Sequence, residues 1–268
     1  MRYLFDDWGR VERQLARSHV YLLMDFDGTI SSIRRDPGAA GLNRNARRAL
    51  DAILHGPGNI SLAVVSGRGL RDIRRRVGIK GITYAGNHGL EIKGPGMGFI
   101  FPGALAAGGA IRKISRKLKA GYRKFNGVIV EDKGFTVSVH FRMAKPSEIK
   151  DITNVFEEVT GPYRAERSIA VTSGKKVLEV RPPVDWDKGK AVGYMVASKK
   201  KELKGKVLAV YIGDDRTDED AFRAIGKNGV CIFVGKPERT SAGYYLNNTG
   251  EVVEFLKRVL KIKGGNEK

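Results

Sequence analysis

The chain has 268 residues, of which 41% are hydrophobic and 29% charged, as in an ordinary globular enzyme of one large or two modest domains. Its longest apolar runs, such as 62–65 and 207–212, are too short to span a bilayer, and its polar amino terminus lacks a secretory core, so we expect a soluble, cytoplasmic protein without a membrane partner. The net charge of +20 predicts attraction to anions, whether nucleic acid, an acidic membrane surface or a phosphorylated small molecule.

Strand-like apolar runs and helix-like spacings alternate through the first part of the chain. We expect strands at 20–26, 60–65 and 82–85, and helices at 44–54 and 69–77. This alternation is typical of a parallel sheet flanked by helices.

The pattern changes after Gly94-Pro95-Gly96 and later returns. A helix at 103–124, strands at 127–131 and 135–141, a helix at 146–159 and strands at 166–172 and 176–181 predict a small open-faced sheet with helices on one side. Alternation resumes with helices at 188–201, 217–225 and 251–260 around strands at 207–212 and 230–234. We therefore expect an α/β fold, in which a Rossmann-like doubly wound parallel sheet core, residues 1–95 and 184–268, carries an inserted α+β cap domain, residues 96–183.

Two carboxylates follow the first strong strand, in the stretch Asp25-Phe26-Asp27-Gly28-Thr29. The carboxyl ends of parallel strands form the edge at which open α/β sheets bind ligands. One carboxylate can attack phosphorus while the other donates a proton to the leaving oxygen, which divides a difficult hydrolysis into two displacements. A solvated acidic turn is the alternative, and the apolar strand that precedes the motif favours catalysis.

Three further groups lie at strand ends or helix starts. Ser66-Gly67-Arg68 offers a hydroxyl and backbone N–H groups to a phosphate, although a simple helix N-cap would have the same pattern. Lys188 begins a helix and could neutralise charge in a transition state, although a solvated lysine is the alternative. The carboxylates of Asp214, Asp215 and Asp218 follow the strand at 207–212 and suit Mg²⁺, with an acidic helix N-terminus as the alternative.

In this order, the four motifs resemble those of the haloacid dehalogenase superfamily of phosphatases. The resemblance implies that Asp25 is the nucleophile, Asp27 the general acid and base, Ser66 a phosphate ligand and Lys188 the charge-stabilising cation. It implies Mg²⁺ as the cofactor, held through Asp25, the backbone carbonyl of Asp27 and Asp214. The full implied metal set is Asp25, Asp27, Asp214, Asp215 and Asp218, of which the last two would support the metal or its waters.

A narrower resemblance, to the trehalose-6-phosphate phosphatases, extends over nearly the whole chain. Residues 86–91 resemble the family motif GNHGxE, and Glu131-x-Lys133 followed by His140-Phe141-Arg142 resembles ExKxxxxxxHYR with phenylalanine in place of tyrosine. Lys176-x-x-Glu179 and the stretch 213–222 complete the set. The implied substrate-binding residues are Gly67, Arg68, Asn87, His88, Glu91, Glu131, Lys133, His140, Arg142, Lys176 and Glu179.

The resemblance implies a phosphoric monoester hydrolase that releases trehalose from trehalose 6-phosphate, a small anionic sugar phosphate, alongside a separate trehalose-phosphate synthase. Other sugar phosphates, such as sucrose phosphate and glycosyl- or mannosyl-phosphoglycerate, are alternative substrates. A cross-strand ladder of ion pairs is the alternative for the cap residues. Nucleic acid is not expected as the main partner, because the basic part of the helix, at 111–124, lacks interleaved aromatics and no nucleic-acid-binding motif is present. A catalytically silent regulatory domain is disfavoured because every catalytic motif position is filled.

Overall fold

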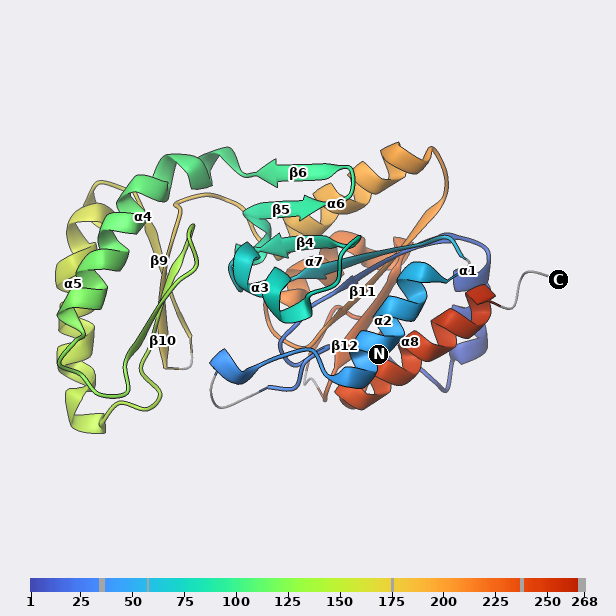
Figure 1. Cartoon of the computed structure of the whole chain (residues 1–268), viewed down its shortest axis with the longest axis horizontal. Helices are drawn as coiled ribbons and strands as arrows, with labels where there is room; N and C mark the ends of the chain where they lie inside the picture. Colours follow the sequence, from blue (N-terminus) through green and yellow to red (C-terminus); the bar gives the residue numbers. More distant parts are fainter. Residues whose placement is uncertain (34–36, 57, 175, 237–238, 265–268) are drawn as a thin grey trace. The chain divides into compact units, whose positions relative to one another are not determined.

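The computed structural model describes residues 1–33, 37–56, 58–174, 176–236 and 239–264 (Figure 1). It divides into two compact units, each with its own sheet. The first comprises Met1–Gly67, Ile73–Gly98 and Trp186–Lys268, and the second comprises Arg68–Asp72 and Phe99–Asp185. Across the described residues, every helix is too short or too polar to serve as a membrane span.

The first unit is organised around a nine-stranded sheet in the order β1-β13-β12-β11-β2-β3-β4-β5-β6. All the pairings from β1 across to β4 are parallel, and β5 joins β4 in the antiparallel direction. The strands are β1 (Arg2–Tyr3), β2 (His19–Met24), β3 (Ile60–Val65), β4 (Thr83–Gly86), β5 (Glu91–Gly94), β6 (Met97–Ile100), β11 (Val207–Gly213), β12 (Val230–Val234) and β13 (Tyr244–Leu246).

Helices cover both faces of this sheet, so its central strands are apolar on both sides. Residues 20–24 of β2 are completely buried. Helices α1 (Trp8–Ala16), α2 (Arg44–His55) and α8 (Thr249–Gly264) pack together on one face, and α6 (Lys188–Leu203) and α7 (Asp218–Ile225) pack together on the other (Figure 1). Helix α3 (Leu70–Val77) connects β3 to β4.

The second unit is a four-stranded antiparallel sheet in the order β7-β8-β10-β9. Its strands are β7 (Ile129–Asp132), β8 (Val137–His140), β9 (Ala170–Gly174) and β10 (Val177–Arg181). Helices α4 (Pro102–Gly121) and α5 (Ile149–Ala165) run side by side along one face (Figure 1). Val137, Val139 and Val180 face these helices in one apolar core, so alternation places Ser138 and Glu179 on the opposite face.

The predicted α/β fold is confirmed: a largely parallel, doubly wound sheet carries a second sheet in the order of elements that the sequence indicates. Several boundaries differ. Helix α4 ends at Gly121 rather than 124, and β8 spans Val137–His140 rather than 135–141, so Arg142 lies in the turn that follows the strand. The second unit takes in Arg68–Asp72 as well as Phe99–Asp185, whereas the predicted cap spans 96–183, and the division into core and cap domains stays a prediction.

Candidate active site

Three neighbouring strands of the first unit end at one edge of the sheet. The register pairs Met24 of β2 with Val64 of β3 on one side and with Ile212 of β11 on the other. Asp25, Ser66 and Asp214, which directly follow these strands, therefore emerge within one or two residues of one another along the edge. The sheet register thus brings together motifs that lie far apart in the sequence.

The loop after β2 turns tightly beneath Asp214. Asp25 is buried, and its backbone N–H donates to the Ile212 carbonyl at 2.8 Å. Gly28 has φ of +84°, and a Cβ at this position would lie 1.9 Å from an Asp214 carboxylate oxygen, so only glycine fits. Thr29 donates its hydroxyl to Asp214 Oδ1 at 3.3 Å. Asp27, on the same loop, is half-buried.

Lys188 is the central cation of the site. Its Nζ lies 2.5 Å from Asp25 Oδ1 and 2.6 Å from Asp218 Oδ1, and its side chain is 2% exposed. Asp187 places it by capping α6, accepting from the Lys190 backbone N–H at 2.8 Å. A buried ammonium between two carboxylates can keep its charge because both partners are within hydrogen-bond distance.

Asp218 accepts four hydrogen bonds and is completely buried. Its Oδ1 receives Lys188 and the Tyr211 hydroxyl, the latter at 2.6 Å. Its Oδ2 receives the backbone N–H groups of Asp214 and Asp215 at 2.9 and 3.0 Å. Asp218 therefore connects the cation to the backbone that carries the other two carboxylates.

Burial and neighbouring charge shift the protonation equilibria of this group. Burial raises the pKa of Asp25 well above its ordinary value despite the charge of Lys188. Burial, with the carboxylates of Asp218 and Asp215, raises the pKa of Asp214 to about 7. Burial alone would lower the pKa of Lys188, but Asp218 and Asp25 hold it well above its ordinary value. The site therefore carries more buried negative charge than Lys188 alone compensates.

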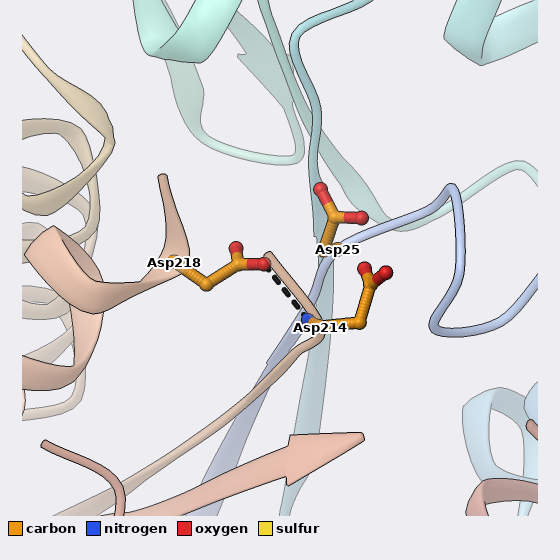
Figure 2. Close-up of side chains that lie close together, drawn as sticks. All are labelled: Asp25, Asp214 and Asp218. Atoms are coloured by element: carbon orange, nitrogen blue, oxygen red, sulfur yellow. Dashed lines mark hydrogen bonds between the residues drawn. The ribbon is translucent and has the colours of Figure 1, made fainter. Parts of the chain in front are cut away.

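Three of these carboxylates could hold a metal ion. Asp25, Asp214 and Asp218 each offer an oxygen, and these oxygens lie within 4.8 Å of one another (Figure 2). Clustered carboxylates with uncompensated charge suit a hard divalent cation. Asp215 is held differently: its Oδ1 accepts from the Thr217 N–H and hydroxyl at 2.8 and 2.7 Å. Burial opposes ionisation of Asp215, but the charge of Lys188 and the Thr217 hydrogen bonds lower its pKa.

Ser66 and the 86–91 segment form a second group along the same edge. Ser66 is buried, its N–H donates to the Ala85 carbonyl and its own carbonyl accepts from the His88 N–H, both at 2.9 Å. A Cβ on Gly67 would lie 2.7 Å from the His88 ring, so the ring lies directly against this glycine. Asn87 donates to Glu91 Oε1 at 2.8 Å.

The 86–91 segment is also conformationally unusual. Asn87, His88 and Gly89 have φ of +51°, +56° and +87° in succession. Left-handed residues other than glycine cost free energy and cluster at functional sites. The backbone of this segment is therefore constrained, and a role in binding stays a prediction.

The second unit carries a polar row on the sheet face opposite its helices. Cross-strand pairing aligns Glu131, Ser138 and Glu179 on adjacent strands. His140 contacts Glu131 Oε2 at 3.0 Å, and Lys133 contacts Glu179 Oε1 at 3.0 Å. Burial opposes ionisation of Glu131, but the His140 hydrogen bond and the charge of Lys133 lower its pKa.

Three other predicted substrate-binding residues lie outside both that row and the group formed by Ser66, Gly67 and residues 86–91. Arg142 is exposed in the turn after β8, and Lys176 is exposed in the turn before β10, with its Nζ 5.9 Å from the centre of the Phe141 ring. Arg68, which groups with the second unit, is buried and pairs with Asp72 at 3.2 Å.

Sequence reasoning missed four residues that position the predicted ones. Thr29 lies within the predicted motif, and its hydroxyl was a usable signal. Tyr211 was indistinguishable from a core aromatic, because its hydroxyl contact with Asp218 depends on the fold. Ser138 donates to Glu179 Oε1 at 3.0 Å, and Thr217 binds Asp215.

A doubly wound sheet with two aspartates after the first strand, a buried lysine and an acidic cluster is the arrangement of haloacid dehalogenase-like phosphatases. Residues 23–249 match the family model for trehalose-phosphatase. The chain is 38% identical over 256 residues to a probable trehalose-phosphate phosphatase D of Arabidopsis thaliana, covering 91% of this chain and 68% of that protein. It therefore belongs to the trehalose-phosphatase family and is a phosphoric monoester hydrolase.

Solved structures agree on the fold. A crystal structure of a trehalose-6-phosphate phosphatase related protein superposes with a TM-score of 0.77 at 22% identity, covering 92% of this chain and all of that one. A haloacid dehalogenase-like hydrolase from Bacteroides thetaiotaomicron superposes with a TM-score of 0.59 at 14% identity, covering 89% and 98% of the two chains. The chain spans 63% to 72% of the length of curated relatives that are 36–38% identical to it.

Proposed function

We propose that the enzyme hydrolyses trehalose 6-phosphate to trehalose and phosphate, with Asp25 as the nucleophile. The observation that carries this proposal is the buried contact between Lys188 and Asp25, at the sheet edge where Asp214 and Asp218 also gather. The ammonium of Lys188 opposes the effect of burial on the Asp25 carboxylate and holds that carboxylate in a fixed direction. Membership of the trehalose-phosphatase family supports the substrate.

In the first step an Asp25 carboxylate oxygen forms a bond to phosphorus as the bond from phosphorus to the sugar oxygen breaks. Asp27, two residues further along the same loop, donates its proton to the departing sugar oxygen. In the second step Asp27 takes a proton from water, and that water displaces the carboxylate of Asp25 from phosphorus. Lys188 neutralises charge in both steps without leaving its position between Asp25 and Asp218.

The acidic cluster fits Mg²⁺. Asp25, Asp214 and the backbone carbonyl of Asp27 would hold it, and it would supply positive charge to the phosphate oxygens. Asp218 would act as support, because both of its oxygens already accept two hydrogen bonds from the protein. Asp215, tied to Thr217, would orient the waters of the ion.

Two further groups would select the substrate. Ser66, with the N–H groups that follow it, would bind the phosphate, and the constrained loop with Asn87 and His88 lies along the same edge. The polar row of Glu131 and Glu179, with Lys133 and His140, would bind the sugar hydroxyls, to which charged side chains make strong directional hydrogen bonds. The cytoplasmic location and the separate synthase remain predictions.

Phosphate release from a panel of sugar phosphates tests this proposal. We expect Mg²⁺-dependent release from trehalose 6-phosphate well above release from sucrose 6-phosphate, glucosyl-phosphoglycerate and glucose 6-phosphate, and loss of release in Asp25→Asn. Preference for another sugar phosphate would overturn the substrate assignment but leave the chemistry. Release by Asp25→Asn at the wild-type rate would overturn the chemistry.

A further inference from the structure

Helix α4 presents one strongly basic surface. Between residues 102 and 124 the sequence has seven Lys and Arg residues and no acidic residue. All seven are exposed: Arg112, Lys113, Arg116, Lys117, Lys119, Arg123 and Lys124. We call this set the α4 basic face. It contributes about a third of the net charge of +20.

The α4 basic face has a fixed direction. The opposite side of the helix, including Ile111, Ile114 and Leu118, is completely buried in the core that it shares with the small sheet. Arg112, Arg116, Lys119 and Arg123 are spaced i, i+4, i+7 and i+11, so they form one stripe about 15 Å long that continues into the turn after the helix. The helix cannot rotate this stripe inward without exposing its apolar side.

Acidic side chains of the protein neutralise little of the charge on the α4 basic face. Among the described acidic side chains, only Asp132 comes within ion-pair distance of these cations, at 3.7 Å from Lys119. Asp132 already accepts from the Ser115 hydroxyl at 2.6 Å. By contrast, Arg76 on α3 serves the fold by donating to the Gly38 carbonyl at 2.9 Å.

Substrate binding does not account for this charge. Within the second unit, α4 packs on the sheet face that carries Val137 and Val139. The polar row with Glu131 and Glu179 lies on the other face. The basic stripe and the proposed sugar-binding row therefore point away from each other across the sheet.

We propose that the α4 basic face binds the phosphate backbone of a nucleic acid, without reading its sequence. Four cations in line match a linear polyanion, because duplex DNA presents one charge about every 1.7 Å along its axis. The exposed positions from 112 to 124 include no aromatic or large aliphatic residue that could insert into a membrane or anchor a protein interface. The absence of base-reading motifs, which argues against nucleic acid as the main partner, is compatible with contacts to phosphates alone.

Fluorescence anisotropy with a mixed-sequence DNA duplex and a single-stranded RNA of equal length, titrated across a salt series, tests this proposal. If four cations contact phosphates, affinity for the duplex should fall on the order of 100-fold between about 50 and about 200 mM salt. The triple variant Arg112→Gln, Arg116→Gln, Arg123→Gln should lower the slope of log affinity against log salt by about 2.7. Arg13→Gln, Arg44→Gln, Arg48→Gln is the matched control, since it removes three exposed arginines from α1 and α2 and should retain most of the slope.

If the control variant lowers the slope of log affinity against log salt as much as the α4 variant does, binding depends on net charge alone and the proposal is overturned. Absence of binding at the lowest salt would also overturn it. If the protein binds phosphatidylserine vesicles more tightly than either nucleic acid, and this binding depends on the same three arginines, the partner is an anionic membrane instead. If it binds an acidic polypeptide more tightly in the same way, the partner is a protein. Sugar phosphatase activity should be unchanged in the α4 variant, and its loss would contradict the separation of the two faces.

Discussion

Replacing Asp218 by asparagine should destabilise the first unit far more than the small change in shape suggests. The aspartate is completely buried and accepts from Lys188, the Tyr211 hydroxyl and two backbone N–H groups. Asparagine keeps one acceptor oxygen, so its amide NH₂ must face either the two N–H groups or the lysine and hydroxyl donors. Two charge-assisted hydrogen bonds are lost in either orientation.

Each such bond contributes about 1.5–3 kcal/mol. Losing two, and leaving Lys188 with Asp25 alone, should lower the free energy of unfolding by about 3–5 kcal/mol, which is the usual cost of breaking a buried ion pair. Asp220→Asn is the matched control on the same helix. Asp220 forms a solvent-exposed ion pair with Arg223, so its loss should cost less than about 1 kcal/mol.

Urea denaturation followed by tryptophan fluorescence measures this difference. Both tryptophans, Trp8 and Trp186, lie in the first unit, so the signal reports the unit that contains the site. Mg²⁺ should be absent, so that metal binding does not contribute to the measured stability. If Asp218→Asn unfolds within about 0.5 kcal/mol of Asp220→Asn, the reasoning that Asp218 organises the buried charges is refuted.

Three further predictions follow from burial and charge. The pKa of Asp214 is about 7 in the folded protein against an ordinary 3.8, so between these values the folded state retains a proton that the unfolded chain releases. The metal-free protein should therefore lose stability as pH rises from about 4 to about 7. In melting curves with EDTA, Asp214→Asn should reduce that loss by on the order of 3 kcal/mol, and an unchanged pH slope would contradict the account. Glu179→Gln should lower kcat/KM for trehalose 6-phosphate about 10- to 100-fold, because it weakens a charge-assisted contact. The control Glu158→Gln, at an exposed position, should leave kcat/KM unchanged. Equal effects of the two substitutions would show that Glu179 does not contact the substrate. Burial raises the pKa of Cys231 to about 12, so this thiol should resist iodoacetamide at pH 8 in the native protein and react only when the protein is unfolded. Peptide mass spectrometry measures the labelling, and rapid labelling of the native protein would contradict this prediction.

The core strands were predictable because burial dictates their composition. The strand at 60–65 and the strand at 230–234 have the predicted limits, since each is an apolar run bounded by turn residues. The edge strands β1 and β6 and their neighbours β13 and β5 were missed, because two to four residues carry no clear periodicity. Helix α1 was also missed, since only Val11 and Leu15 of its nine residues are buried.

The chemical motifs of the site could be read from the sequence, but their connections could not. Nothing local indicates that Thr29 contacts Asp214, 185 residues further along the chain, or that Lys188 bridges Asp25 and Asp218. Those contacts arise from the register of β2, β3 and β11, which places three strand ends together. The sequence likewise could not show that the α4 basic face and the polar row lie on opposite sides of one sheet.

The most direct test of the central claim is to trap the phosphoryl group on the protein. Asp27→Asn removes the proton donor of the first step and the base of the second. The phosphoryl-enzyme should therefore form slowly, and it should persist because no carboxylate remains to take a proton from water. After Asp27→Asn is mixed with trehalose 6-phosphate and Mg²⁺ and quenched in acid, mass spectrometry of its peptides should find one phosphoryl group, on Asp25. The label should be lost on treatment with hydroxylamine and absent when Asp25→Asn is added. A phosphoryl group on any other residue, or hydrolysis at the wild-type rate by Asp25→Asn, would contradict the assignment of Asp25 as the nucleophile.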